Sequence, residues 1–162
     1  MYHRNATRIV RTLIICFLTL ALAAQLHAAD ADDSSFDKAL EKHLAAVRDK
    51  NFDNLVATLP DKGELILILP SGQKSDTAEA YKTMHKSWFA QSGWTMKHEV
   101  LKKHRSQGMG YALVKSDYHE ADRGGKPYHN QLFVSLIFRR TEKGWVLVFD
   151  QCTKIPAEPS KG

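Results

Sequence analysis

The sequence predicts an α+β domain in which a curved antiparallel sheet wraps around N-terminal helices. Two helical patterns come first, and four long strand patterns separated by Gly-containing breaks occupy the C-terminal part of the chain. A short strand pair and a third helical pattern lie between them. For this order of elements, helices gathered on one face of the sheet are the stable arrangement.

Residues 1–28 predict a secretory signal peptide rather than part of the fold. Arg4, Arg8 and Arg11 precede an apolar stretch, LIICFLTLALAAQL, and the small-residue exit LHAAD follows it. The stretch is shorter than the roughly 20 residues that a membrane span needs. We therefore expect a secreted, periplasmic protein that is cleaved near Ala28. An uncleaved signal peptide, as the only membrane attachment, is the alternative.

The remaining chain has a balanced charge. Three of the 23 basic residues and none of the 18 acidic residues lie in residues 1–28, which leaves 20 basic against 18 acidic. No long basic run interleaved with aromatic residues remains, so we expect no nucleic-acid partner. Cys152 is the one cysteine that survives cleavage and therefore cannot form a disulfide within the chain.

The helical part begins after a polar leader at residues 29–35. Apolar residues then repeat at helical spacing, with His43 beside their stripe; they are Phe36, Leu40, Leu44 and Val47. FDNLVATLP predicts a second, short helix that Pro60 ends.

A strand at residues 64–69, a turn at residues 70–72 and a short return strand come next. The third helix starts with Asp76 or Thr77 as its N-cap, and Glu79 is placed to close a capping box with Asp76. Gly93 is expected to end this helix.

The last four segments predict antiparallel hairpins. WTMKHEVLKKH, MGYALVKSDYHEA, YHNQLFVSLIFRRT and the stretch that starts with GWVLVFDQCT are each long, and each is followed or preceded by a glycine. The domain is thus expected to span residues 36–155, with a tail at residues 156–162.

This order, with a last strand that closes as aromatic–x–x–Val–x–Asp–x–x–Ser/Thr, resembles the nuclear-transport-factor-2-like superfamily, which includes SnoaL-like cyclases and ketosteroid isomerase. The most specific segments are GGKPYHNQLFVSLIFRRTEKGWVLVFDQCT and AAVRDKNFDNLVATL. The resemblance implies a cone: the sheet wraps the helices and leaves a pocket open at one end. It also implies a homodimer through the outer face of the sheet.

Strand alternation predicts which side chains face the cone. In relatives the position of Cys152 commonly faces the pocket, which selects one inward set on the last strand: Val146, Val148, Asp150 and Cys152. The inward set of the preceding strand is Tyr128, Asn130, Leu132, Val134, Leu136 and Phe138, and that of the first long strand is Trp94, Met96, His98 and Val100. For residues 111–120, Asp117/His119 and Ser116/Tyr118 remain equal alternatives. Both faces of the last two strands are largely apolar, which also favours a homodimer.

The candidate catalytic residues are His43, His98 and Asp150, which we expect to converge in the pocket. A carboxylate beside an imidazole shifts the imidazole towards its charged form and orients it, as a general base requires. The candidate ligand-binding residues are Tyr81, His85, Trp94, Met96, Tyr128, Asn130, Leu132, Val134, Leu136, Val148 and Cys152, with Tyr81, His85 and Tyr128 near the mouth. The alternative is structural: buried core histidines, a carboxylate that bonds a backbone amide or a tyrosine, and a cysteine that packs as a small apolar residue.

Ketosteroid isomerase chemistry is not expected. The family's tyrosine falls at about His43, but its two carboxylates fall at Leu69 and at Val134 or Leu136. No phosphate loop, HExxH or CxxC motif is present, and we expect no metal site and no cofactor.

The sequence favours the first of three functions. It is a pocket for a small organic ligand, for which the residues do not establish catalysis. The second is an isomerase, cyclase or dehydratase that uses pocket His and Asp residues. The third is a protein-interaction module whose pocket is filled by its own Trp94, Met96 and Phe138.

Overall fold

A computed structural model describes residues 35–157 of the chain. The predicted signal peptide and its cleavage site, all but the last residue of the predicted leader, and residues 158–162 of the tail lie outside the described residues. Among residues 35–157, no helix has both the length and the apolar character that a membrane crossing requires.

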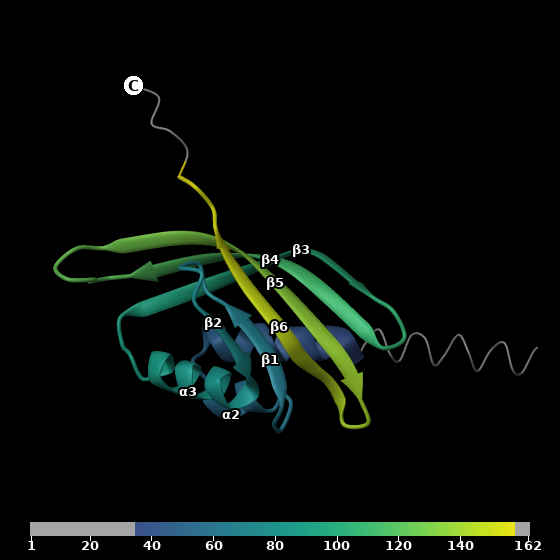
Figure 1. The fold of residues 1–162 in the computed structure, drawn as a ribbon. Helices are drawn as coiled ribbons and strands as arrows, with labels where there is room; N and C mark the ends of the chain where they lie inside the picture. The colour runs from purple at the N-terminus through teal and green to yellow at the C-terminus, as the bar shows by residue number, and fades with distance from the viewer. Residues whose placement is uncertain (1–34, 158–162) are drawn as a thin grey trace, which may run out of the picture. The chain divides into compact units, whose positions relative to one another are not determined.

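The elements follow the order that the sequence predicts (Figure 1). Residues 35–48 are helical, so Ser35 belongs to the helix and not to the leader. The other elements are α2 (Phe52–Val56), β1 (Glu64–Ile68), β2 (Lys74–Thr77), α3 (Ala78–Phe89), β3 (Trp94–Arg105), β4 (Met109–Glu120), β5 (Tyr128–Thr141) and β6 (Gly144–Lys154).

The strands form one six-stranded sheet in the order β2-β1-β6-β5-β4-β3, and the helices lie on one side of it (Figure 1). The α+β prediction is therefore confirmed. One pair departs from the antiparallel expectation, because β1 and β6 run parallel. Parallel neighbours need a long connection, and β2, α3 and three further strands separate these two along the chain.

The predicted helical stripe forms the core against the sheet. Phe36, Leu40, Leu44 and Val47 are all buried. The Phe36 ring meets the rings of Phe138 and Trp145 edge-on, at centroid distances of 5.8 and 5.2 Å. Such aromatic contacts stabilise beyond the apolar area they bury, and they fix the helix against β5 and β6.

Helix α3 has one of its two predicted N-caps but not the predicted capping box, and it ends before Gly93. Thr77 is the N-cap, and its Oγ1 accepts a hydrogen bond from the Ala80 N–H at 3.1 Å. Asp76 instead pairs with Lys74 at 2.8 Å, so the capping box with Glu79 does not form. The helix ends at Phe89, and Gly93, with φ 86°, makes the turn into β3.

A β-bulge in β6 reverses the predicted alternation of that strand. Leu147 pairs with Phe138 and Phe149 pairs with Ile137, which leaves Val148 as the extra residue. Trp145 and Leu147 are consequently buried on the same face as Asp150. The prediction that Val146 and Val148 face inward is wrong for this reason, whereas the inward prediction for Asp150 and Cys152 agrees with the structure.

The structure also shows which side chains of β3, β4 and β5 face the concave side of the sheet. On β4, Ser116 and Tyr118 are buried, so Asp117 and His119 face outward. On β3 Val100 pairs with Val114, which is buried on the concave side, so Val100 faces that side as predicted, although it is 41% exposed. The register of β3 shifts only after Val100, between Val100 and Lys102. The inward set predicted on β5 lies on the concave face.

The close contact between β4 and the first helix yields a test of packing. A Cβ added at Gly110 would lie 2.6 Å from Cε2 of Phe36, whereas one added at Gly108 meets nothing within 4 Å. Gly110→Ala should therefore lower the free energy of unfolding by about 2 kcal/mol, as overpacking does, in urea titrations. Gly108→Ala is the matched control.

A double-mutant cycle checks the cause. The double variant Phe36→Leu/Gly110→Ala should lose less free energy of unfolding than the two single variants lose in sum. Strict additivity would contradict the contact.

Candidate functional site

The concave face of the sheet and the helices enclose a cavity of about 650 Å³. Most of its wall is apolar, with Leu44 and Val47 from the first helix, Leu67 from β1, and Leu132 and Val134 from β5. The volume lies within the range of pockets that take small organic molecules.

All three candidate catalytic residues line this cavity: His43, His98 and Asp150. Eight of the predicted ligand-binding residues also line it, namely His85, Met96, Tyr128, Asn130, Leu132, Val134, Leu136 and Cys152.

Three predicted ligand-binding residues do not line the cavity. Tyr81 is fully buried behind Asp150, so it does not lie near the mouth, and neither does the buried His85. Trp94 packs into the core by stacking on Trp88 at 4.3 Å. Val148 is turned away from the concave face by its bulge.

Among residues 35–157, Asp150 is the one acidic side chain in the cavity wall. The Tyr81 hydroxyl donates to its Oδ2 at 2.9 Å, and Cys152 Sγ lies 3.7 Å from its Oδ1. Burial raises the pKa of Asp150 to about 6, because the loss of hydration outweighs these two hydrogen bonds. Burial, with Asp150 alongside, also raises the pKa of the Cys152 thiol, which makes this thiol a poor nucleophile.

A line of polar contacts continues from Tyr81 into the core. The Tyr81 hydroxyl lies 3.5 Å from Nε2 of His43, and Nδ1 of His43 lies 2.8 Å from Oγ1 of Thr58. Thr58 donates its own proton to the Leu55 carbonyl at 2.7 Å, so Nδ1–H of His43 must be the donor to Thr58. Nε2 of His43 therefore presents a lone pair to Tyr81.

The cavity histidines are neutral. Burial lowers the pKa of His43 to about 3, with smaller contributions from His85 and His98. Burial also lowers the pKa of His85 and of His98 to about 4. No histidine among the described residues bonds Asp150, because Tyr81 lies between Asp150 and His43. The predicted His–Asp pair with a charged imidazole is therefore wrong.

Two buried polar atoms in the cavity wall have no hydrogen-bond partner within residues 35–157. His98 bonds Ser116 Oγ through Nδ1 at 2.9 Å, which leaves its Nε2 unpaired. Oδ1 of Asn130 is the second such atom. Unsatisfied buried polar atoms are unfavourable, so a ligand or water that reached them would be stabilised.

The loop between β4 and β5 contributes Arg123 to the cavity wall. Its guanidinium lies 3.4 Å from the centroid of the Tyr128 ring and pairs with Glu120. Arg123 is absent from the predicted site residues, because it stands in a Gly-rich break with no motif around it. Ser116 and Tyr118, which strand alternation left as one of two alternatives, line the cavity.

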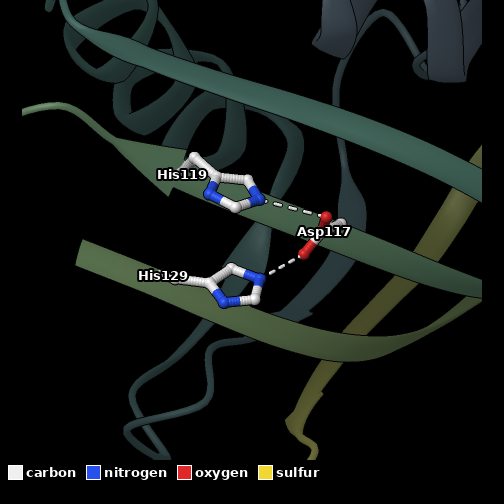
Figure 2. A group of neighbouring side chains, drawn as sticks. All are labelled: Asp117, His119 and His129. Atoms are coloured by element: carbon white, nitrogen blue, oxygen red, sulfur yellow. Dashed lines mark hydrogen bonds and ion pairs between the residues drawn. The ribbon is translucent and has the colours of Figure 1, made fainter. Parts of the chain in front are cut away.

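The opposite face of the sheet carries a second polar cluster. Asp117, His119 and His129 lie close together there (Figure 2). This cluster does not line the cavity, because alternate residues of β4 point to opposite faces.

Comparisons with known proteins agree with this architecture. The sequence model of a family described as SnoaL-like domain matches residues 37–156. A search of the curated proteins found no match.

Solved structures show the same fold at low identity. A nuclear transport factor 2 (NTF2-like) superfamily protein from Salmonella enterica superposes with a TM-score of 0.65 and 11% identity, over 83% of this chain and 99% of that one. A ketosteroid isomerase-like protein from Erwinia carotovora atroseptica superposes with a TM-score of 0.64 and 16% identity, over 76% of this chain and 96% of that one. An LEH-like epoxide hydrolase from M. tuberculosis superposes with a TM-score of 0.56 and 14% identity, over 73% of this chain and 80% of that one.

The raised pKa of Asp150 predicts a specific dependence of stability on pH. The folded state holds the proton up to about pH 6, whereas the unfolded carboxyl releases it near 3.8. Protonated Asp150 therefore contributes stability below about pH 4 that is lost as the pH rises through 6. Asp150→Asn should remove this loss of stability, so the unfolding free energy of the variant relative to that of the wild type should rise by about 2 kcal/mol between pH 4 and 7.

Urea unfolding at several pH values measures this difference, and the histidine contributions cancel in it. Tyr81→Phe is the companion variant. This variant removes a hydrogen bond to the carboxylate, so the pKa of Asp150 should rise further. The loss of stability should then occur at a higher pH. A pH-independent difference for Asp150→Asn would contradict the buried carboxyl.

Proposed function

The chain belongs to the SnoaL-like domain family, and we propose on this premise that it binds a small, largely apolar organic molecule in the cavity of its sheet. The observation that carries the proposal is the cavity of about 650 Å³, with an apolar wall and a few polar side chains. Such a composition is typical of small-molecule sites, in which apolar contacts supply affinity and a few polar groups set orientation.

The side chains of the wall leave the cavity unfilled, which favours this function over an interaction module with a filled pocket. Trp94 and Phe138, two of the three residues expected to fill it, are buried in the core and do not line the cavity. Met96 lines the wall, yet the cavity remains. Space for a ligand is therefore present without any rearrangement of side chains.

The charges around the cavity restrict the ligand. His43, His85 and His98 are neutral at neutral pH, and Asp150 is the one acidic group that the described part of the chain places in the wall. A ligand with an anionic group near Asp150 would be repelled at neutral pH. We expect an uncharged ligand with hydrogen-bonding groups, with any anionic group directed at Arg123.

Acid–base catalysis is the second candidate function, and the pKa of Asp150 near 6 favours it. A carboxyl that titrates close to neutral pH can accept a proton from a bound molecule and return it. The cavity histidines are weaker bases, because their pKa values lie near 3 or 4. An isomerase, cyclase or dehydratase reaction would therefore depend on Asp150, with Tyr81 as the residue that positions its carboxyl.

We also propose that the chain is secreted and forms a homodimer. Secretion rests on the signal-like residues 1–28. The dimer rests on the exposed large apolar side chains of β4 and β5 on the outer face, which are Met109, Tyr111 and Phe133. Exposed apolar groups of this size on one sheet are typical of interaction surfaces.

Native mass spectrometry of protein purified from its own periplasm tests ligand binding and secretion together. We expect a chain that lacks residues 1–28 and carries one small molecule per subunit, which denaturation releases for identification. Val134→Phe should fill part of the cavity and lower occupancy at least tenfold, whereas Ser135→Phe, the next residue on the opposite face, is the control. A protein that is empty and gains no compound from a cell extract would favour the interaction module.

With the ligand identified, Asp150→Asn separates the two candidate functions. The variant should keep binding, and under the catalytic alternative it should lose turnover by at least a factor of 100. Turnover that survives the substitution would exclude Asp150 as the base.

Sedimentation velocity at micromolar concentration tests the dimer. We expect a dimer that Phe133→Glu converts to monomer, because the substitution places a charge among exposed apolar side chains of the outer face. Gln73→Glu in the exposed β1–β2 turn is the control. A monomeric wild-type protein would overturn this proposal.

A further inference from the structure

The β4–β5 hairpin brings three potential metal ligands together on the outer face of the sheet. Asp117 and His119 are two residues apart on β4 and therefore point to the same side. His129 lies directly opposite His119 on β5, in the antiparallel register of the two strands. The cluster thus stands on rigid, paired strands and not on a loop.

The side chains of this cluster converge on one point (Figure 2). Nε2 of His119 lies 3.1 Å from Oδ2 of Asp117, and Nε2 of His129 lies 2.5 Å from Oδ1 of the same carboxylate. The two imidazole rings stack nearly parallel, with their centroids 4.1 Å apart and an interplanar angle of 10°. One ligand atom from each residue falls within 4.8 Å of the others.

We propose that Asp117, His119 and His129 bind a divalent transition-metal ion of the zinc class. Zinc bonds of about 2.0–2.2 Å place neighbouring ligand atoms roughly 3.3 Å apart. The two nitrogen–oxygen distances, 3.1 and 2.5 Å, lie at and below that value, and the three ligand atoms fall within 4.8 Å of one another. Side-chain rotations that widen the shorter contact would bring one atom of each residue onto one ion. The ion takes the place of the Nε2 protons that face the carboxylate.

The donor set selects the kind of metal. Two imidazole nitrogens and one carboxylate suit zinc, copper or nickel, whereas magnesium and calcium prefer oxygen ligands alone. The His119 and His129 side chains are 49% and 51% exposed. Solvent therefore reaches the ion, and water completes the coordination around three protein ligands.

This site is separate from the proposed ligand cavity, which lies on the other face of the sheet. Ser116 and Tyr118, the neighbours of Asp117 on β4, line the cavity instead. The metal site and the cavity can therefore be tested independently. The sequence predicts no metal site here, because the three residues lie on two strands and the loop between the strands separates them along the chain.

Calorimetric titration of the untagged mature chain with Zn²⁺ tests the proposal. We expect one ion per chain, and at least a tenfold loss of affinity for each of Asp117→Asn, His119→Gln and His129→Gln. His104→Gln is the matched control: His104 is exposed on the adjacent strand β3 and lies outside the cluster. This variant should bind Zn²⁺ as the wild type does.

A second readout reports on the ligands themselves. Histidine side-chain NMR resonances of His119 and His129 should shift on addition of Zn²⁺, while those of His104 stay in place. The site would be overturned if the chain did not bind Zn²⁺ or bound one ion per two chains. An equal loss of affinity in His104→Gln, or unchanged affinity in the variants of Asp117, His119 and His129, would also overturn it. Urea unfolding of each variant shows that the loss is not caused by a failure to fold.

Discussion

The hydrogen bond from Tyr81 to the buried carboxyl of Asp150 joins α3 to the end of β6, and the organisation of the cavity depends on it. Burial removes most of the hydration that an ionised carboxylate needs, and one hydroxyl and one thiol replace only part of it. Through Tyr81 the same contact reaches His43 and Thr58, so a line of polar groups crosses the core from sheet to helices. The protonation of Asp150 is thereby coupled to the packing of the helical layer.

The bulge at Val148 is what places Asp150 at this position. Without the extra residue, strict alternation would put Asp150 and Leu147 on opposite faces of β6. With it, the first part of the strand contributes to the core and the last part lines the cavity, both on the concave side. Because of this single bulge, the concave face of β6 contributes Trp145 and Leu147 to the apolar core and Asp150 and Cys152 to the cavity wall.

The sheet also separates two chemical environments. On its concave side the imidazoles are buried and neutral, which suits the recognition of an uncharged molecule. On its outer side Asp117, His119 and His129 are in contact with solvent and with one another, which suits a cation. The two sets differ because burial disfavours charge, while exposed groups keep their hydration. Alternation along β4 assigns Ser116 to one environment and Asp117 to the other.

The order of elements, the α+β class and the buried stripe from Phe36 to Val47 could be predicted from the sequence. They follow from the periodicity of apolar residues, which local chain geometry converts directly into faces. The inward direction of Asp150 also needed the family resemblance, because alternation alone leaves two possible faces. Three features could not be predicted: that Tyr81 separates His43 from Asp150, that Arg123 reaches the cavity, and that the outer cluster forms. The register between β4 and β5, the bulge and the packing of α3 on the sheet arise from contacts between distant segments, which no local pattern encodes.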